Sequence, residues 1–174
     1  RALGFVFQSS ALFDYLNVFE NVAFGVRRRK HLSAKELSSK VSGLLADVEM
    51  PGTEALMPSE LSGGMRKRVG LARALAMEPT VVLYDEPTSG LDPVTAYAID
   101  ELIVNTRDRL GVTSIVVSHD VSSVMRVADR IAFLEKGRLT FVGTPEQFRS
   151  ASGDAVRELV EKARAESLAP DRSR

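Results

Sequence analysis

Two adjacent carboxylates follow the most strand-like segment of the chain. Val81 to Tyr84 is a continuous apolar run, and Asp85 and Glu86 come directly after it. An aspartate in this position can hold magnesium, usually through water, because a hard cation prefers oxygen ligands. A glutamate one residue further on can orient and polarise the water that attacks a terminal phosphate. The alternative is a pair of solvated acids at a strand end, and these two residues alone do not decide between the interpretations.

A second candidate is the turn Leu61-Ser62-Gly63-Gly64-Met65, which opens a predicted helix. Its two glycines would let the backbone approach an anion closely, and Ser62 supplies a hydroxyl. The helix N-terminus adds free N–H groups and a partial positive charge. The turn could also be an ordinary helix start that Ser62 caps, and taken by itself the sequence favours this structural interpretation.

Three further polar residues stand near predicted strand ends or helix starts. Gln8 follows the short apolar run 5–7, and His119 follows the apolar run 113–117, where it could donate a hydrogen bond to a phosphate. Asp92, with Pro93 after it, has the pattern of a helix N-cap. Ligands of parallel sheets bind at the carboxyl ends of the strands, so Gln8, the acidic pair and His119 should converge on one rim. A lone histidine is more often structural or exposed, and Asp92 alone indicates only a capped turn.

The elements that would position these residues alternate between strands and helices. An amphipathic helix is predicted from Ser33 to the Pro51-Gly52 stop, and a second follows Gly64 and ends at Glu78-Pro79. A third starts at Asp92. The remaining predicted elements are a buried-type strand at 113–117, a helix after 120, a hairpin of 131–134 with 139–142, and a terminal helix near 156–163 before a frayed end. This alternation indicates an α/β fold with a largely parallel sheet.

Composition excludes several classes of protein. The 174 residues are 44% hydrophobic and 26% charged, the balance of a folded globular chain, and 23 basic residues offset 23 acidic ones. We therefore expect no nucleic-acid partner, and we interpret the basic runs 27–30 and 66–68 as solvated helix faces. There is no cysteine and no apolar run long enough for a membrane span. Residues 1–7 have the pattern of a strand rather than a signal peptide, and with no initiating Met the chain is expected to be a fragment.

Taken together, these segments resemble the ATP-binding subunits of ABC transporters. Gln8, LSGGM at 61–65, VVLYDEP at 81–87, SGLD at 89–92 and His119 stand in the order of that family's Q-loop, signature motif, Walker B motif, D-loop and switch histidine. The resemblance runs from Leu3 to about Phe148. It implies a P-loop NTPase (RecA-like) parallel-sheet core, partial in this chain, with an inserted α-helical subdomain. The implied division is 1–8 for the end of the N-terminal core, 9–77 for the helical subdomain, 78–150 for the catalytic core, and 151–174 for a C-terminal helix and tail.

The resemblance also implies ATP and Mg²⁺ as cofactors and a homodimer that encloses two nucleotides. Glu86 would be the catalytic carboxylate, His119 would steady the γ-phosphate, and Gln8 and Asp85 would contact magnesium. The signature turn and Asp92 would act on the nucleotide held by the opposite subunit. The nucleotide-binding positions implied in this way are Gln8, Leu61, Ser62, Gly63, Gly64, Asp85 and Asp92.

Two features depart from the family pattern. Met65 stands where the family usually has Gln, and no G-x-x-x-x-G-K-[ST] loop (Walker A) occurs in the chain. Without that loop there are no cradling amides and no lysine for the β- and γ-phosphates. In the family the loop lies upstream of the Q-loop, so we expect an N-terminal truncation. The 174 residues alone should then bind ATP poorly and not hydrolyse it.

Three segments and one residue narrow the resemblance to the Mla-type phospholipid-transport ATPases. They are residues 7–14, 17–24 and 57–60, together with Met65. Those ATPases work with a permease and an MCE-domain lipid-binding protein. The resemblance implies a permease that docks near residues 8–25, in an aromatic-rich stretch that could instead simply pack the core. It also implies a peripheral location on the cytoplasmic face of the inner membrane.

Other ABC proteins remain as alternatives. Chromosome-maintaining ABC ATPases would place a long coiled coil between Gln8 and the signature, where only 52 residues lie and no heptads are sustained. Translation-associated ABC proteins carry two cassettes. A degenerate subunit acting only in assembly is the non-enzymatic alternative, which Glu86 and His119 disfavour and which the upstream sequence would test.

Overall fold

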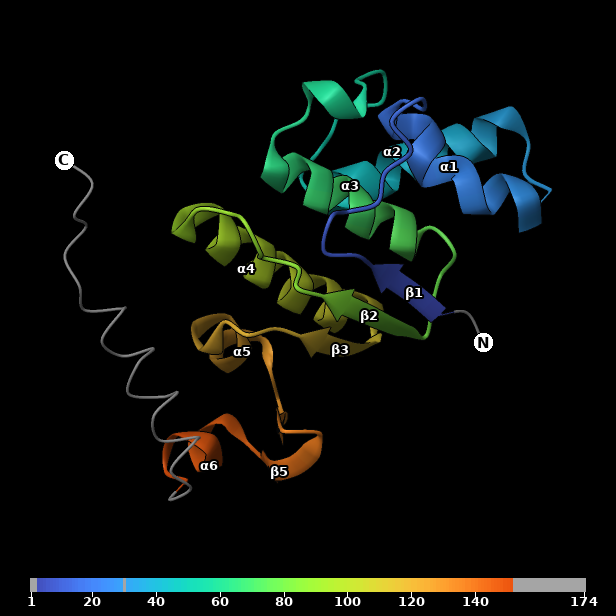
Figure 1. The fold of residues 1–174 in the computed structure, drawn as a ribbon. Helices are drawn as coiled ribbons and strands as arrows, with labels where there is room; N and C mark the ends of the chain where they lie inside the picture. Colours follow the sequence, from blue (N-terminus) through green and yellow to red (C-terminus); the bar gives the residue numbers. More distant parts are fainter. Residues whose placement is uncertain (1–2, 30, 152–174) are drawn as a thin grey trace, which may run out of the picture. The chain divides into compact units, whose positions relative to one another are not determined.

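The computed structural model describes residues 3–29 and 31–151 (Figure 1). The chain forms two compact units, Arg1–Val117 and Ser118–Arg174, and each is described by itself below. The terminal helix expected near 156–163 and the frayed end lie outside the described residues. The expected subdomain boundaries at residues 8, 77 and 150 remain predictions.

A three-stranded parallel sheet forms one layer of the first unit. Its strands are β1 (Leu3–Val6), β2 (Val81–Asp85) and β3 (Thr113–Val117), hydrogen-bonded in that order. Phe5 pairs with Leu83, and Leu83 pairs with Ile115. Because the strands are parallel and joined by helical crossovers, the expected α/β fold is confirmed, and the ends of β1 and β2 open on the same edge.

Four helices of the first unit lie between β1 and β2 in the chain. They are α1 (Val18–Arg29), α2 (Ala34–Asp47), the short 3₁₀ helix η1 (Pro58–Glu60) and α3 (Gly63–Leu75). In Figure 1, α3 lies between the other helices and β1, and it contacts α1, α2, β1 and α4. The predicted start at Ser33 is confirmed, because Ser33 and Glu36 form a reciprocal capping box.

The last helix of the first unit is α4 (Pro93–Leu110), which begins at the predicted Asp92 cap and ends at Gly111 in a left-handed conformation. One hydrophobic core joins the helices to the inner face of the sheet. Its fully buried side chains come from α1, α2, α3 and β2 and include Val18, Val22, Val26, Val41, Leu45, Val69 and Val82. Tyr84 lies in the same core.

The outer face of the sheet differs from the expectation for residues 113–117. That segment was predicted to be a buried strand, but Ile115 is 51% exposed and Val117 is 59% exposed. The prediction is wrong because only one face of the described sheet packs on helices. Side chains alternate between the two faces of a strand, so Leu3 and Phe5 share the exposed face with Ile115.

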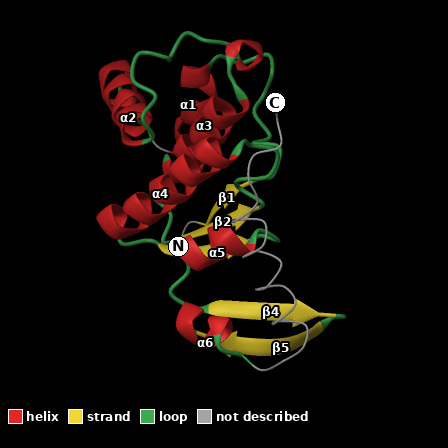
Figure 2. Cartoon of the chain, turned by 90° about the vertical axis from the view of Figure 1, so that its left-hand side faces the viewer, coloured by secondary structure: helices red, strands yellow, loops and turns green. Residues whose placement is uncertain are grey.

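The second unit contains a hairpin between two short helices (Figure 2). Its elements are α5 (Val121–Val127), β4 (Ile131–Glu135), β5 (Arg138–Gly143) and α6 (Pro145–Arg149). The strands are antiparallel and turn at Lys136 and Gly137, both at positive φ, which confirms the predicted hairpin. Phe148 of α6 packs against Phe133 and Phe141 to form a small core.

In the basic run 66–68, Arg66 is exposed as predicted, but the other two residues do not belong to a solvated helix face. Lys67 is only 6% exposed, and Arg68 is largely covered. The prediction failed because backbone carbonyls distant in sequence accept hydrogen bonds from these cations.

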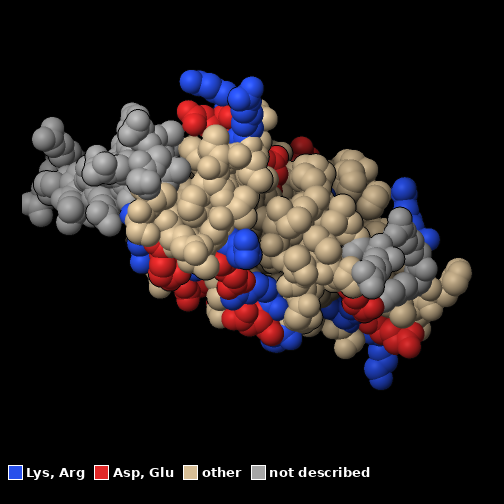
Figure 3. Space-filling view, turned by 90° about the horizontal axis from the view of Figure 1, so that it is seen from below, with Lys and Arg blue, Asp and Glu red and all other residues tan. Residues whose placement is uncertain are grey.

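On the face shown in Figure 3, most Lys and Arg side chains have Asp or Glu beside them. Within residues 3–29 and 31–151, no helix combines the length and apolar character that crossing a bilayer requires.

Candidate functional site

The acidic pair stands where β2 leaves the sheet. Asp85 is the last residue of β2, and both Asp85 and Glu86 are half-buried. Glu86 has φ 47°, a left-handed conformation that is unfavourable for a residue with a Cβ. Its N–H donates to the carbonyl of Val117 at 2.9 Å, and its carbonyl accepts from the N–H of Ser89 at 3.2 Å. The backbone of the proposed catalytic carboxylate is therefore strained and held in place.

Gln8 belongs to the same network, although it comes from another strand end. It is the second residue after β1, and its Nε2 donates to Ser89 Oγ at 3.3 Å. The Nζ of Lys67 on α3 donates to the backbone carbonyl of Gln8 at 2.6 Å and to that of Glu86 at 3.1 Å. The structure thus places Gln8, Ser89 and Glu86 together.

Lys67 is a part of this site that sequence reasoning missed. Burial lowers the pKa of its ammonium group, while the nearby carboxylates of Glu86 and Asp85 act in the opposite direction. The spacing of residues along α3 was a signal in the sequence for this contact. Lys67, Gly70 and Arg73 follow one another at three-residue intervals on α3, and all three face the segment after β1.

Arg73 holds the next part of that segment. Its Nη2 donates to Ser10 O at 2.9 Å and its Nη1 to Ala11 O at 2.7 Å. Ser10 and Ala11 have φ of 62° and 45°, so two successive residues with side chains are left-handed. Burial lowers the pKa of Arg73. Gly70 lies against the same segment, and a Cβ on it would be at an ordinary contact distance of 3.4 Å from the Cβ of Ser10.

The signature turn starts α3 as the structural alternative supposed. Ser62 Oγ accepts from the N–H of Met65 at 3.3 Å, so Ser62 caps the helix. Gly64 is buried, and a Cβ on it would lie 2.6 Å from Cγ2 of Thr95 on α4, closer than real side chains approach. Leu61 is part of the hydrophobic core, whereas Ser62 and Gly63 are exposed. Contact of this turn with a nucleotide stays a prediction.

Asp92 and His119 have different structural surroundings. Asp92 is exposed and caps α4, accepting from the N–H groups of Val94 and Thr95 at 3.1 and 3.0 Å. A hydrogen bond with the side chain of Thr95, followed by those from the N–H groups of Thr95 and Val94, lowers the pKa of Asp92. His119 is an exposed residue of the second unit, two positions after β3. Its convergence with Gln8 and the acidic pair therefore stays a prediction.

The aromatic-rich segment after Gln8 is organised by one buried amide. Asn21 accepts from the N–H of Phe13 at 2.8 Å and donates to the carbonyls of Phe13, Leu16 and Asn17 at 2.9 to 3.1 Å. Other rings of the segment pack near Phe13, with the centroid of Phe24 at 4.5 Å. The segment combines a fixed backbone with exposed aromatic surface, since Tyr15 is 73% exposed.

The oxygen groups at the strand ends fit magnesium only in part. In the described residues, no three acidic or histidine side chains gather as metal ligands. The carboxylate of Asp85 and the amide of Gln8 offer oxygen donors, which a hard cation prefers. Magnesium commonly keeps several waters and takes phosphate oxygens as further ligands. The donor set is therefore consistent with a cation that arrives together with a nucleotide.

Comparison with known proteins settles the family. The family model described as "ABC transporter" matches residues 1–89, about half of the chain. The chain belongs to the ABC transporter family. The Q-loop strand, the signature turn and the carboxylate pair all lie within the matched residues.

Curated relatives of this ABC transporter chain have names that point to different cargoes. The sulfate/thiosulfate import ATP-binding protein CysA of Bacillus cereus is 45% identical over 150 residues, 84% of this chain and 42% of CysA. The intermembrane phospholipid transport system ATP-binding protein MlaF of Escherichia coli is 40% identical over 161 residues, 92% of this chain and 60% of MlaF. The chain thus spans about half the length of these relatives.

A solved structure agrees with the fold. It is a dimeric post-hydrolysis state of the ATP-binding cassette MJ0796, bound to ADP and Pi, with a TM-score of 0.73 and 32% identity. The match covers 82% of this chain and 62% of the other. The α/β fold of the ABC ATPases is therefore shown for this chain.

Proposed function

We propose that the complete subunit to which this chain belongs binds and hydrolyses ATP with Mg²⁺ and drives an ABC transporter. One observation carries the proposal. The backbone of Glu86, directly after β2, shares a hydrogen-bond network with Gln8, just after β1, as in a site built at the carboxyl edge of a parallel sheet. Such an edge is where α/β folds bind nucleotides.

Each residue of the network then has a defined task. Glu86 accepts a proton from the attacking water, and its held backbone keeps the carboxylate in one place. Gln8 orients that water through its amide, whose nitrogen already donates to Ser89. Asp85 would help to hold magnesium, usually through water. Magnesium, when bound, would neutralise charge on the phosphates. His119 would steady the γ-phosphate.

Two copies of the subunit would complete each nucleotide site. Ser62 and Gly63 are exposed at the N-terminus of the 13-residue helix α3, whose free N–H groups favour an anion. Asp92 is exposed on the following motif. ATP would then stabilise a closed homodimer, and hydrolysis would release it. The dimeric cassette bound to ADP and Pi supports this arrangement.

The decisive experiment replaces Glu86 by Gln in the complete subunit and measures ATP binding and steady-state hydrolysis. We expect binding to persist and turnover to fall by at least about two orders of magnitude, the effect of losing a positioned base. Glu54→Gln is the matched control, because an amide oxygen can still accept the hydrogen bond of Ser42. Near-normal turnover in Glu86→Gln would remove Glu86 from its assigned role.

For the cargo, we propose phospholipid moved with a permease and an MCE-domain protein, at the cytoplasmic face of the inner membrane. MlaF covers more of this chain than CysA does, although CysA is more identical over the shorter match. The permease would dock near residues 8–25, where Tyr15 is exposed on a fixed backbone. The subunit would touch neither the cargo nor nucleic acid.

A transport assay separates the two cargoes. The complete subunit would be purified with the permease encoded beside it and placed in vesicles. We expect ATP-dependent transfer of a fluorescent phospholipid and co-purification of an MCE-domain protein. ATP-dependent sulfate uptake without lipid transfer would instead support a CysA-like importer and refute the phospholipid proposal.

A further inference from the structure

A buried lysine joins the two strand-end segments of the proposed site. Lys67 extends from the middle of α3, and its Nζ donates to the backbone carbonyls of Gln8 at 2.6 Å and Glu86 at 3.1 Å. These residues are separated by 59 and 19 positions from Lys67. Since one ammonium group holds both, the two backbone oxygens are neighbours, and the ends of β1 and β2 are fixed to each other.

Little else is available to replace Lys67 in this position. The side chain lines a small apolar cavity of about 10 Å³ together with Val6, Leu71, Tyr84 and Pro87. A space of that size holds at most about one water. Without the ammonium group, the carbonyl of Gln8 would lose this hydrogen bond, and that of Glu86 would keep the one from Ser89, so both segments would be less firmly held.

The backbone of Glu86 is where such movement would matter. A left-handed residue with a side chain costs on the order of 1–2 kcal/mol and persists only where its surroundings hold it. The N–H of Glu86 is held by Val117 and its carbonyl by Ser89 and Lys67. Lys67 adds the connection to Gln8, because it reaches the segment after β1 as well. A rotation at Glu86 would displace its carboxylate directly.

We propose that Lys67 is a positioning residue, which holds the carbonyls of Gln8 and Glu86 and thereby sets the place of the Glu86 carboxylate relative to the Gln8 amide. This rests on the proposed ATP hydrolysis. Both hydrogen bonds of the Lys67 ammonium group go to backbone carbonyls, so it acts through the two residues that it holds. Its loss should lower turnover rather than nucleotide affinity.

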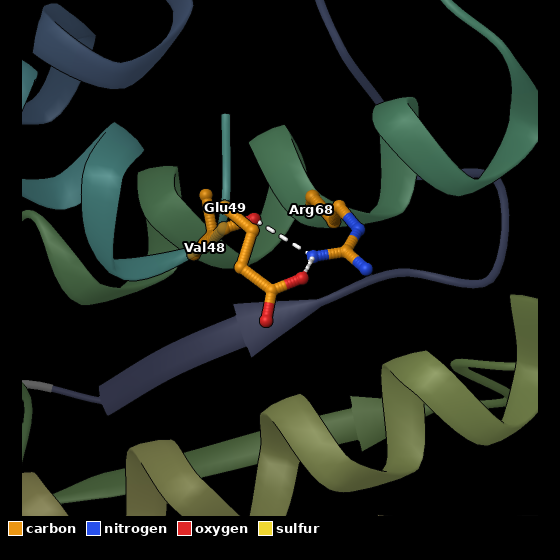
Figure 4. A network of polar contacts seen from close by, with 3 residues as sticks. All are labelled: Val48, Glu49 and Arg68. Carbon is orange, nitrogen blue, oxygen red and sulfur yellow. Dashed lines mark hydrogen bonds and ion pairs between the residues drawn. The ribbon is translucent and has the colours of Figure 1, made fainter. Parts of the chain in front are cut away.

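The test uses the complete subunit with Lys67→Met and Lys67→Arg, and Arg68→Met as the matched control. Arg68 is the next residue of α3 and is also a covered cation that donates to a backbone carbonyl, that of Val48, at 3.0 Å, besides its ion pair with Glu49 (Figure 4). It contacts the end of α2 rather than the strand ends. Thermal unfolding, kcat and KM for ATP would be measured for all three.

We expect Lys67→Met to lower kcat by about tenfold to a hundredfold, the scale of a misplaced catalytic group, with KM changed by no more than about twofold. Arg68→Met should lower the melting temperature yet keep kcat. Lys67→Arg keeps donors and charge and should recover part of kcat. In a Glu86→Gln background Lys67→Met should add no further loss, because both changes remove the same function.

The outcomes distinguish this inference from the proposed function. If the wild-type subunit does not hydrolyse ATP, both fail. If it does, and Lys67→Met keeps normal kcat, only the positioning role is refuted. Losses that simply multiply in the double variant, or equal losses of kcat in Lys67→Met and Arg68→Met, would show a general structural effect and also refute it.

Discussion

Arg73 donates a hydrogen bond of 2.9 Å to the backbone carbonyl of Ser10, a residue held in the left-handed conformation. The same guanidinium reaches Ala11 O, so one cation holds two strained residues. We predict that Arg73→Met lowers the free energy of unfolding by about 2 kcal/mol, because a charged donor to the carbonyls of Ser10, which is buried, and Ala11 is lost. Urea denaturation of the complete subunit would measure it.

A second substitution checks that strain is the cause. Ser10→Gly in the Arg73→Met background should recover about 1 kcal/mol, since glycine adopts positive φ without cost. Arg73→Met without any loss of stability, or a Ser10→Gly change that only destabilises further, would contradict this account.

Gly64 should not tolerate a side chain. A Cβ there would lie 2.6 Å from Cγ2 of Thr95, so Gly64→Ala should lower the free energy of unfolding by roughly 1–3 kcal/mol through overpacking. Thr95→Ser removes that methyl group, keeps the hydroxyl, and should restore most of the loss. Gly43 in α2 is the control, because nothing lies near its Cβ and alanine there should stabilise by up to about 1 kcal/mol.

The Asp92 cap should make stability depend on pH in the acid range. Hydrogen bonds from Thr95 and Val94 lower the pKa of Asp92 below its ordinary 3.8. The folded state therefore favours the carboxylate, whose contribution is complete above the ordinary pKa and is lost as pH falls through the folded value. The melting-temperature advantage of the wild type over Asp92→Ala should shrink below about pH 4. Asn at position 92 caps the helix but does not titrate. The melting temperature of Asp92→Asn should therefore exceed that of Asp92→Ala by the same amount throughout this pH range.

Tyr15 should matter for the permease and not for folding. Its side chain is 73% exposed, so Tyr15→Ala should leave the melting temperature unchanged. If the permease docks on residues 8–25, loss of an aromatic contact should weaken co-purification several-fold, or about 1–2 kcal/mol. Tyr97→Ala, on the half-exposed side of α4, is the control. Equal capture by both variants would place docking elsewhere.

Local patterns predicted the parts of the fold that local contacts determine. The helix start at Ser33 and the cap at Asp92 were predicted correctly, because in both places a side chain satisfies N–H groups two or three residues away. The helix α1 was not predicted, because the segment was interpreted from its aromatic residues. Its apolar residues Val18, Val22 and Val26 recur every fourth residue and are fully buried. That spacing was a visible signal.

Features that depend on distant residues were not predictable. The burial of Lys67 follows from carbonyls that only the folded chain brings near it, so composition indicated a solvated face. The exposure of Ile115 follows from which layers cover the sheet, and a strand's own residues do not report that. The roles of Ser62 and His119 toward a nucleotide remain predictions for a related reason, because they depend on groups outside one copy of the first unit.

The four hydrogen bonds of Asn21 have a consequence for the proposed docking of a permease on the aromatic segment. The loop they hold is already ordered in the free chain, so binding there freezes few additional torsions on this side. The entropic penalty of association would then fall almost entirely on the incoming partner. If the permease docks there, this surface would bind and release it repeatedly without refolding between cycles.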